Sequence, residues 1–135
     1  MQTRMKNFVT QVPAAPSPEA ERHYQAKFTF ETDCWDVHST EDFDDRGFVL
    51  VDVRSPELYA KGHLQGAINI PHAKLTEKRL EEYAMDTLFV VYCSGPHCNG
   101  STRGALRLAQ QGRPVKEMIG GVTGWIDEGF TLVTE

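Results

Sequence analysis

Two short, continuous apolar runs constrain the fold of this chain most: FVLVDV at residues 48–53 and TLFVVY at residues 87–92. Both are rich in β-branched or aromatic residues and do not alternate with polar ones, which is typical of strands covered on both faces. Segments with helix start and stop signals follow them, SPELYAKG at 55–62 and STRGALRLAQQG at 101–112. Strands that alternate with helices form parallel sheets. The sequence therefore predicts an α/β fold, a central parallel sheet with helices on both faces.

Similar signals predict the remaining elements. Short strands are expected at 34–38, 66–71 and 115–119, and helices at 17–28, 39–47, 74–84 and 124–129. In the first helix, Ser17 is the expected N-cap, with Pro18 at the first helical position. Ala20, Tyr24 and Phe28 follow at helical spacing, so they form a face that could dock on the domain.

The length and the proline distribution predict one domain with an N-terminal extension. A chain of 135 residues is most simply a single domain. Residues 1–16, which are rich in proline at their end, are predicted to be a mobile arm. Residues 17–34 form a helical extension, and residues 35–135 form the domain itself.

Composition and charge disfavour several classes of function. The chain is 40% hydrophobic and 24% charged, as in ordinary globular proteins. Its net charge is −5, its pI is about 5.5 and it has no cluster of Lys and Arg, so we expect neither a nucleic-acid nor a membrane partner. We see no apolar signal peptide and no segment of transmembrane length. We therefore expect a cytoplasmic protein, in a compartment where thiols stay reduced.

The loop at residues 93–100, CSGPHCNG, carries the clearest chemical signal. Cys93 directly follows a predicted buried strand, and the helix that begins near Ser101 points its N-terminus back toward the loop. The partial positive charge of a helix N-terminus lowers the pKa of a nearby thiol, and the thiolate is the nucleophilic form. Ser94, Gly95 and Gly100 are small enough for the backbone N–H groups to converge on an anion. The pattern indicates a pocket for a reactive sulfur atom.

Other interpretations of the cysteines remain open at this point. Cys93 could be an inert, buried residue at a strand end. The odd number of cysteines in a reducing compartment disfavours a permanent disulfide, although a transient Cys93–Cys98 link stays possible. A metal site made of Cys93, His97 and Cys98, with Cys34, lacks the usual ligand spacing, so we expect no metal. Cys34, next to Trp35, is expected in the core.

Three stretches of the sequence resemble the single-domain rhodanese family over residues 35–132. They are VLVDVRSPELYAKGHLQGAINIPHAKL, then VVYC with its loop, and RLAQQGRPVKEMIGGVTGWIDEGF. The longer loop YCSGPHCNGSTR is similar to that of a bacterial subset with two cysteines. The resemblance implies a rhodanese-like three-layer domain over residues 35–135.

The resemblance also implies sulfurtransferase chemistry. Cys93 would take a sulfane sulfur from a small donor such as thiosulfate, form a persulfide, and pass the sulfur to cyanide or to a thiol acceptor, without a cofactor. Asp52 and Arg54 would support the loop, and no protein partner is indicated. Arg103 would bind an anionic donor or support the thiolate. The loop expected to hold the transferred sulfur comprises Ser94, Gly95, Pro96, His97, Asn99, Gly100, Ser101, Thr102 and Arg103.

The loop is two residues longer than the common family pattern, which bears on the choice between the two cysteines. Cys93 is preferred as the catalytic residue because it closes the strand. Cys98 is a possible second thiol, either resolving or sulfur-carrying. A phosphatase-like enzyme needs the sequence spacing C-x5-R. The spacing to Arg103 is C-x4-R from Cys98 and C-x9-R from Cys93, so neither cysteine fits. The alternative function is a non-catalytic sulfur carrier or a thiol redox-sensing module.

Overall fold

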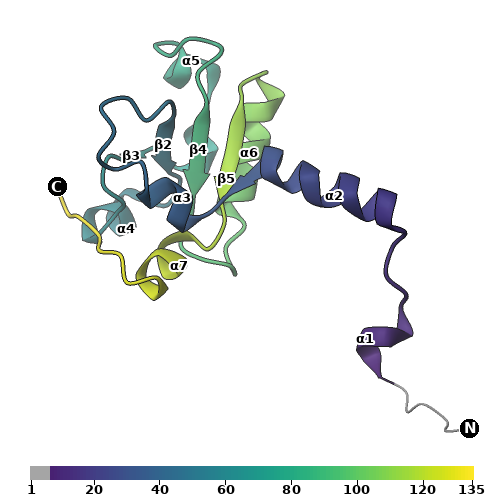
Figure 1. Cartoon of the computed structure of the whole chain (residues 1–135). Coiled ribbons are helices and arrows are strands. Elements are labelled where there is room, and N and C mark those ends of the chain that lie inside the picture. The colour runs from purple at the N-terminus through teal and green to yellow at the C-terminus, as the bar shows by residue number, and fades with distance from the viewer. Residues whose placement is uncertain (1–6) are drawn as a thin grey trace, which may run out of the picture.

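A computed structural model describes residues 7–135 and shows a five-stranded sheet between helices, with every strand pair parallel (Figure 1). The strands are β1 Glu31–Thr32, β2 Val49–Asp52, β3 Ile68–Asn69, β4 Phe89–Tyr92 and β5 Val115–Met118. Their order across the sheet is β1-β5-β4-β2-β3. The predicted α/β fold with a central parallel sheet is confirmed, and the two apolar runs are its neighbouring central strands β2 and β4.

The helices begin and end close to the expected signals. They are α1 Phe8–Gln11, α2 Ser17–Phe30, α3 Cys34–His38, α4 Pro56–Lys61, the 3-10 helix η1 His72–Lys74, α5 Glu77–Leu80, α6 Gly100–Gln110 and α7 Gly121–Asp127. In α4, the Ser55 hydroxyl accepts from the N–H of Leu58, Pro56 opens the helix and Gly62 ends it. Among residues 7–135, no helix is long and apolar enough to cross a membrane.

The alternation of side chains along the central strands divides the core into two layers. On one face of β4, Phe89, Val91 and Cys93 pack with residues that include Leu108 of α6. On the other face, Val90 and Tyr92 pack with residues that include Trp125 of α7. Because both faces are covered, all four residues of β4 are buried. Cys93 therefore lies on the face that α6 covers.

Two of the predicted elements between residues 34 and 47 were wrong. The expected strand at 34–38 is helix α3, because the Asp33 carboxylate accepts from the N–H of Asp36 and caps it. The expected helix at 39–47 consists of turns. Phe43 in this segment is 58% exposed, so a helix there would have had no apolar face to bury.

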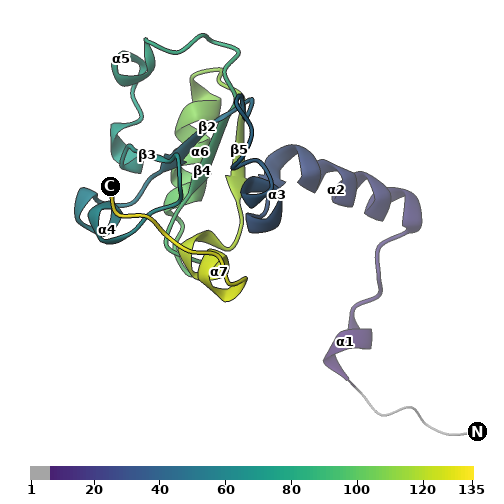
Figure 2. The same ribbon diagram turned by 60° about the vertical axis from the view of Figure 1, so that its left-hand side comes forward.

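Further predictions need smaller corrections. The expected helix at 74–84 is split into η1 and α5, with Leu75 and Thr76 between them. In α2, Ser17 lies inside the helix and makes no capping bond, and Pro16 is the N-cap. Helix α2 has no buried residue, and Tyr24 and Phe28, on the face expected to dock, are 61% and 76% exposed. Helices α1 and α2 extend away from the sheet in both views (Figures 1 and 2).

The predicted mobile arm at residues 1–16 falls partly outside the described structure. Residues 1–6 lie outside the described residues, and α1 occupies residues 8–11 of the rest without burying a side chain. Within the predicted extension at 17–34, strand β1 pairs with β5 and forms an edge of the sheet.

Candidate functional site

The loop from Cys93 to Asn99 connects the carboxyl end of β4 to the N-terminus of α6. Its first residues are held by the start of α7, because the N–H of Val122 donates to the carbonyl of Cys93 at 3.0 Å. The N–H of Thr123 donates to the carbonyl of Ser94 at 2.9 Å. Segments nearly thirty residues apart in the sequence thus fix the position of Cys93.

The close approach of α7 to the loop depends on Gly121. This residue has a φ of +60°, and a Cβ on it would lie 2.5 Å from the carbonyl oxygen of Cys93. A side chain at this position would therefore be strained and would collide with the backbone of the loop. Gly120 and Gly121 both have positive φ values, +92° and +60°, and form a tight turn at the start of α7.

Both cysteine side chains of the loop meet at the first residue of α6. A disulfide joins Cys93 to Cys98, with their Cα atoms 6.4 Å apart. A Cβ on Gly100 would lie 2.9 Å from Sγ of Cys93 and 3.3 Å from Sγ of Cys98, so glycine leaves room for both sulfur atoms. The N–H of Gly100 donates to Sγ of Cys98 at 3.4 Å. Cys93 is only 5% exposed, whereas Cys98 is half-buried.

A cavity of about 210 Å³ opens beside the two sulfur atoms. Six of the residues expected at the site line it, together with residues that follow from β5 into the start of α7. The lining residues are Cys93, Gly95, Pro96, Cys98, Ser101, Thr102, Glu117, Met118, Ile119, Gly120 and Gly121.

The other residues of the expected loop lie outside the lining of this cavity, although the N–H of Gly100 donates to Sγ of Cys98. Arg103 is exposed, and its Nε donates to Oδ1 of Asn99 at 3.2 Å. Ser94, which is half-buried, and His97, which is exposed, are also absent from the lining. Arg103 is therefore placed against Asn99 and not in the cavity, where the sequence interpretation would have used it to bind an anionic donor.

Glu117 is the charged residue among the lining residues that were not predicted from the sequence. The hydroxyls of Ser101 and Thr102, in the first turn of α6, both donate to Oε2 of Glu117 at 3.3 Å. Glu117 lies in β5, which pairs with β4 in a register that sets it opposite Val91. The available signal was its position near the carboxyl end of a predicted strand, the edge of a parallel sheet where ligands bind.

A buried polar cluster includes Tyr92, the residue that precedes Cys93. The Asp52 carboxylate is fully buried and accepts from Nη2 of Arg54 at 2.7 Å and from the Tyr92 hydroxyl at 2.8 Å. The Tyr92 hydroxyl accepts in turn from the N–H of Leu64. Burial, together with the nearby Asp52 carboxylate, raises the pKa of Tyr92 above its ordinary value, so the hydroxyl stays protonated and donates. Asp52 and Arg54 thus contact the residue that precedes Cys93 and do not line the cavity.

Cys34 occupies the core beneath the tight turn, as expected. Its Sγ lies 3.7 Å from the carbonyl oxygens of Ile119 and Gly121. Burial, followed by the charges of Asp33 and Glu128, raises the pKa of Cys34 to about 11. This thiol is therefore protonated at neutral pH and a poor nucleophile.

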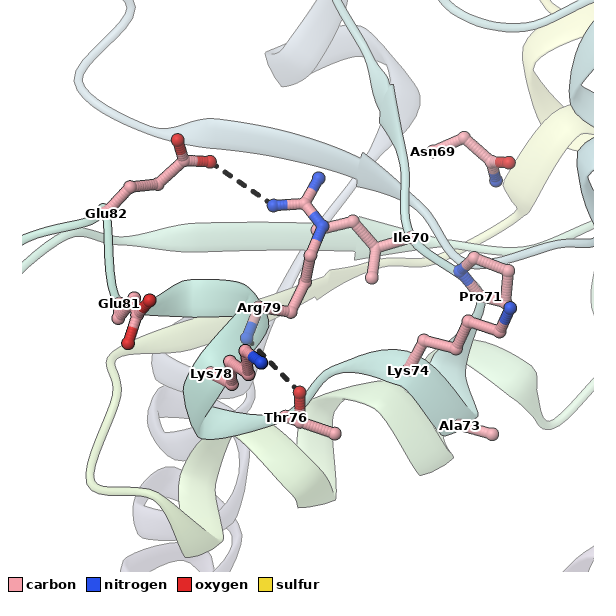
Figure 3. A pocket seen from close by; sticks show the side chains of 10 residues that line it. All are labelled: Asn69, Ile70, Pro71, Ala73, Lys74, Thr76, Lys78, Arg79, Glu81 and Glu82. Carbon is pink, nitrogen blue, oxygen red and sulfur yellow. Dashed lines mark hydrogen bonds and ion pairs between the residues drawn. The ribbon is translucent and has the colours of Figure 1, made fainter.

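A larger groove of about 710 Å³ lies elsewhere, along the segment from β3 to α5 (Figure 3). Arg79 and Glu82 form an ion pair at 3.2 Å at one side of it, and Lys74 and Lys78 lie along the rest. It shares no lining residue with the cysteine cavity and contains no thiol. Within residues 7–135, no group of three or more His, Cys, Asp or Glu is placed to hold a metal ion. The cavity at Cys93 and Cys98 is therefore the candidate site.

Comparisons with known proteins agree with this fold. The model of the family described as rhodanese-like domain matches residues 38–128. An HTH-type transcriptional regulator of Mycobacterium tuberculosis is 44% identical over 87 residues, which make up 59% of this chain and 38% of the regulator. The chain thus spans well under half the length of that relative.

Two solved structures are also similar. The BH2092 protein of Bacillus halodurans superposes with a TM-score of 0.83 and 37% identity, over 87% of this chain and 86% of that one. A thiosulfate sulfurtransferase of Pseudomonas aeruginosa superposes with a TM-score of 0.65 and 28% identity, over 85% of this chain and 21% of that one.

Proposed function

This chain belongs to the rhodanese-like domain family, and from that premise we propose that it is a sulfurtransferase that works through a persulfide on Cys93. The observation that carries the proposal is the meeting of two sulfur atoms with the N-terminus of α6 beside a cavity. A helix N-terminus favours the thiolate over the thiol, and the cavity gives a small donor access to it.

The first step needs Cys93 in its reduced form. Its thiolate attacks the outer sulfur of the donor, a new sulfur–sulfur bond forms on Cys93, and the donor's own bond to that sulfur breaks. With thiosulfate the leaving group is sulfite, which carries away the electron pair of the broken bond. Two hydrogen bonds fix the position of the strand end while the thiolate reacts. The carbonyl of Cys93 accepts from the N–H of Val122, and the hydroxyl of Tyr92 donates to Asp52.

The second step passes the sulfur on, to cyanide, to an external thiol, or by way of Cys98. In the last route, the Cys98 thiolate attacks the inner sulfur of the persulfide, which forms the Cys93–Cys98 disulfide and releases hydrosulfide. An external dithiol then reduces the disulfide and restores both thiols. The disulfide between Cys93 and Cys98 supports this role for Cys98, because the resolving step would form the same bond. A cytoplasmic setting would supply such dithiols.

The same disulfide supports a second candidate function. A module that cycles between the dithiol and the disulfide forms could report sulfur or redox state without turning over a substrate. The match to a protein named as a transcriptional regulator is compatible with such a sensing role.

Sulfur transfer to cyanide tests the proposal. The protein is first reduced, and thiocyanate formation is measured for the wild type and for Cys93→Ser, Cys98→Ser and Cys34→Ala. We expect Cys93→Ser to fall to the background rate and Cys98→Ser to keep transfer to cyanide but release no hydrosulfide when cyanide is omitted. Cys34→Ala is the matched control, because it removes a thiol that lies outside the cavity.

Two results would contradict the proposal. Activity in Cys93→Ser together with none in Cys98→Ser would assign the persulfide to the other cysteine. A wild type that transfers sulfur from no donor, yet still forms the disulfide reversibly, would favour the redox-sensing module.

A further inference from the structure

We infer that Glu117 sets the donor specificity of the site, so that it uses singly charged organic sulfur donors in preference to the thiosulfate dianion. The inference rests on the proposed sulfurtransferase function and narrows its substrate class. It starts from the charge of the cavity. Among the described residues that line the cavity, Glu117 is the only one with an acidic or basic side chain.

The position of Glu117 disfavours the binding of a dianion in two ways. Its carboxylate faces the first turn of α6, where a helix otherwise attracts an external anion. The hydroxyls of Ser101 and Thr102, which could donate to the oxygens of a sulfonate group, both donate to Glu117 instead. A donor with two negative charges would therefore meet a like charge and find these hydrogen-bond donors occupied.

No basic side chain compensates for this charge inside the cavity. Arg103, in the first turn of α6, is exposed, and its guanidinium donates to Asn99. The remaining side chains of the lining are small, polar and uncharged, or apolar, such as Pro96, Met118 and Ile119. Such a surface suits an organic substituent on the donor better than a second charged oxygen.

Thiosulfate and methanethiosulfonate form a matched pair of donors for this question. In both, the Cys93 thiolate attacks the terminal sulfur, the bond from that sulfur to the sulfonyl sulfur breaks, and the electron pair leaves with the sulfonyl group. The products are the Cys93 persulfide and either sulfite or methanesulfinate. The two donors differ by a methyl group in place of one charged oxygen, so they compare a charge of −1 with a charge of −2.

The test measures kcat/KM of both donors with reduced wild type, Glu117→Gln and Glu81→Gln. Gln keeps an oxygen that can accept from Ser101 and Thr102 but removes the charge. Because Coulomb energy scales with the charge of the donor, we expect Glu117→Gln to raise kcat/KM about tenfold for thiosulfate and about threefold for methanethiosulfonate. Glu81→Gln changes the net charge equally, at an exposed residue directly after α5 and outside the cavity, and should leave the ratio unchanged.

Ionic strength gives a second measurement, whose main comparison uses the wild type alone. Salt screens repulsion between like charges, so wild-type kcat/KM should rise with ionic strength more for thiosulfate than for methanethiosulfonate. In Glu117→Gln this difference should shrink.

The inference would be overturned if Glu117→Gln changed the kcat/KM of both donors by the same factor and so left their ratio unchanged. A merely structural role of Glu117 predicts that result. A salt response equal for both donors in the wild type would also contradict it. In these cases the protein still transfers sulfur, so the proposed function survives. If the wild type accepts sulfur from neither donor, it is the proposed function that fails.

Discussion

At the scale of single residues, the cluster of Asp52, Arg54 and Tyr92 stabilises the end of the strand that precedes Cys93. Asp52 is completely buried and contacts both Arg54 and Tyr92. A buried ion pair contributes little net free energy when it is intact, but removing one partner leaves an uncompensated buried charge. A substitution that removes only one partner of the cluster should therefore lower the stability most.

The first prediction concerns the loss of that carboxylate. Asp52→Ala leaves the guanidinium of Arg54, which is 8% exposed, without its partner, and should lower the free energy of unfolding by about 3–5 kcal/mol. Urea denaturation measures the change. The control is Glu82→Ala, which removes a carboxylate from the exposed ion pair with Arg79 and should cost no more than about 1 kcal/mol. Equal losses in the two variants would show that the buried cluster has no special role.

The second prediction concerns pH and Cys34. Burial raises the pKa of this thiol from its ordinary value of 9.0 to about 11. Between pH 9 and 11 the unfolded chain loses the Cys34 proton while the folded chain keeps it, so the free energy of unfolding should fall as the pH rises through this window. Denaturation at several pH values, in wild type and Cys34→Ala, measures the effect. The decline should be shallower in the variant, and parallel curves would contradict the assignment.

At the scale of elements, the N-terminus of α6 is built around the absence of a side chain at Gly100. The Sγ atoms of Cys93 and Cys98 occupy the space where a Cβ would be. Gly104 lies one turn later on the same helix, where a Cβ would instead approach Leu75 and Val53 at 3.2 Å. Alanine substitutions at the two glycines therefore distinguish an effect on the thiols from a general effect on α6.

The third prediction uses this pair. Gly100→Ala should push the sulfur atoms apart and slow both persulfide formation and closure of the disulfide by about tenfold or more, because small displacements of reacting atoms are costly. Gly104→Ala should leave both rates close to those of the wild type. Stopped-flow measurement with reduced protein gives the rates. If the two variants behave alike, the absence of a side chain at Gly100 does not matter for the chemistry.

The elements also show what the sequence can predict. Strands β2 and β4 were predictable because their apolar runs are continuous, and α6 was predictable because Gly112 and Pro114 end its apolar pattern. Residues 34–38 were mistaken for a strand because CWDVH has β-forming residues, whereas the cap from Asp33 makes them helical. The apolar pattern of Ala20, Tyr24 and Phe28 was real, but a pattern does not say whether any surface covers it.

At the scale of the whole molecule, the site is a product of chain topology. The parallel sheet sets the ends of β4 and β5 side by side, and the turn after β5 brings α7 onto the loop of Cys93. The cysteines and most of the loop could be predicted, since they are contiguous in the sequence. Glu117 could not, because its contact with Ser101 and Thr102 depends on how β5 pairs with β4. For the same reason the placement of Arg103 against Asn99 needed the folded structure.

The central claim is that Cys93 carries the transferred sulfur, and locating that sulfur by mass tests it most directly. Reduced Cys98→Ser protein, in which the persulfide cannot be resolved internally, is treated with methanethiosulfonate, alkylated, digested and analysed by mass spectrometry. We predict the mass of one additional sulfur atom on the peptide that contains Cys93 and none on the peptide that contains Cys34. An unmodified Cys93 in Cys98→Ser, together with an additional sulfur on Cys98 in the wild type or in Cys93→Ser, would contradict the account.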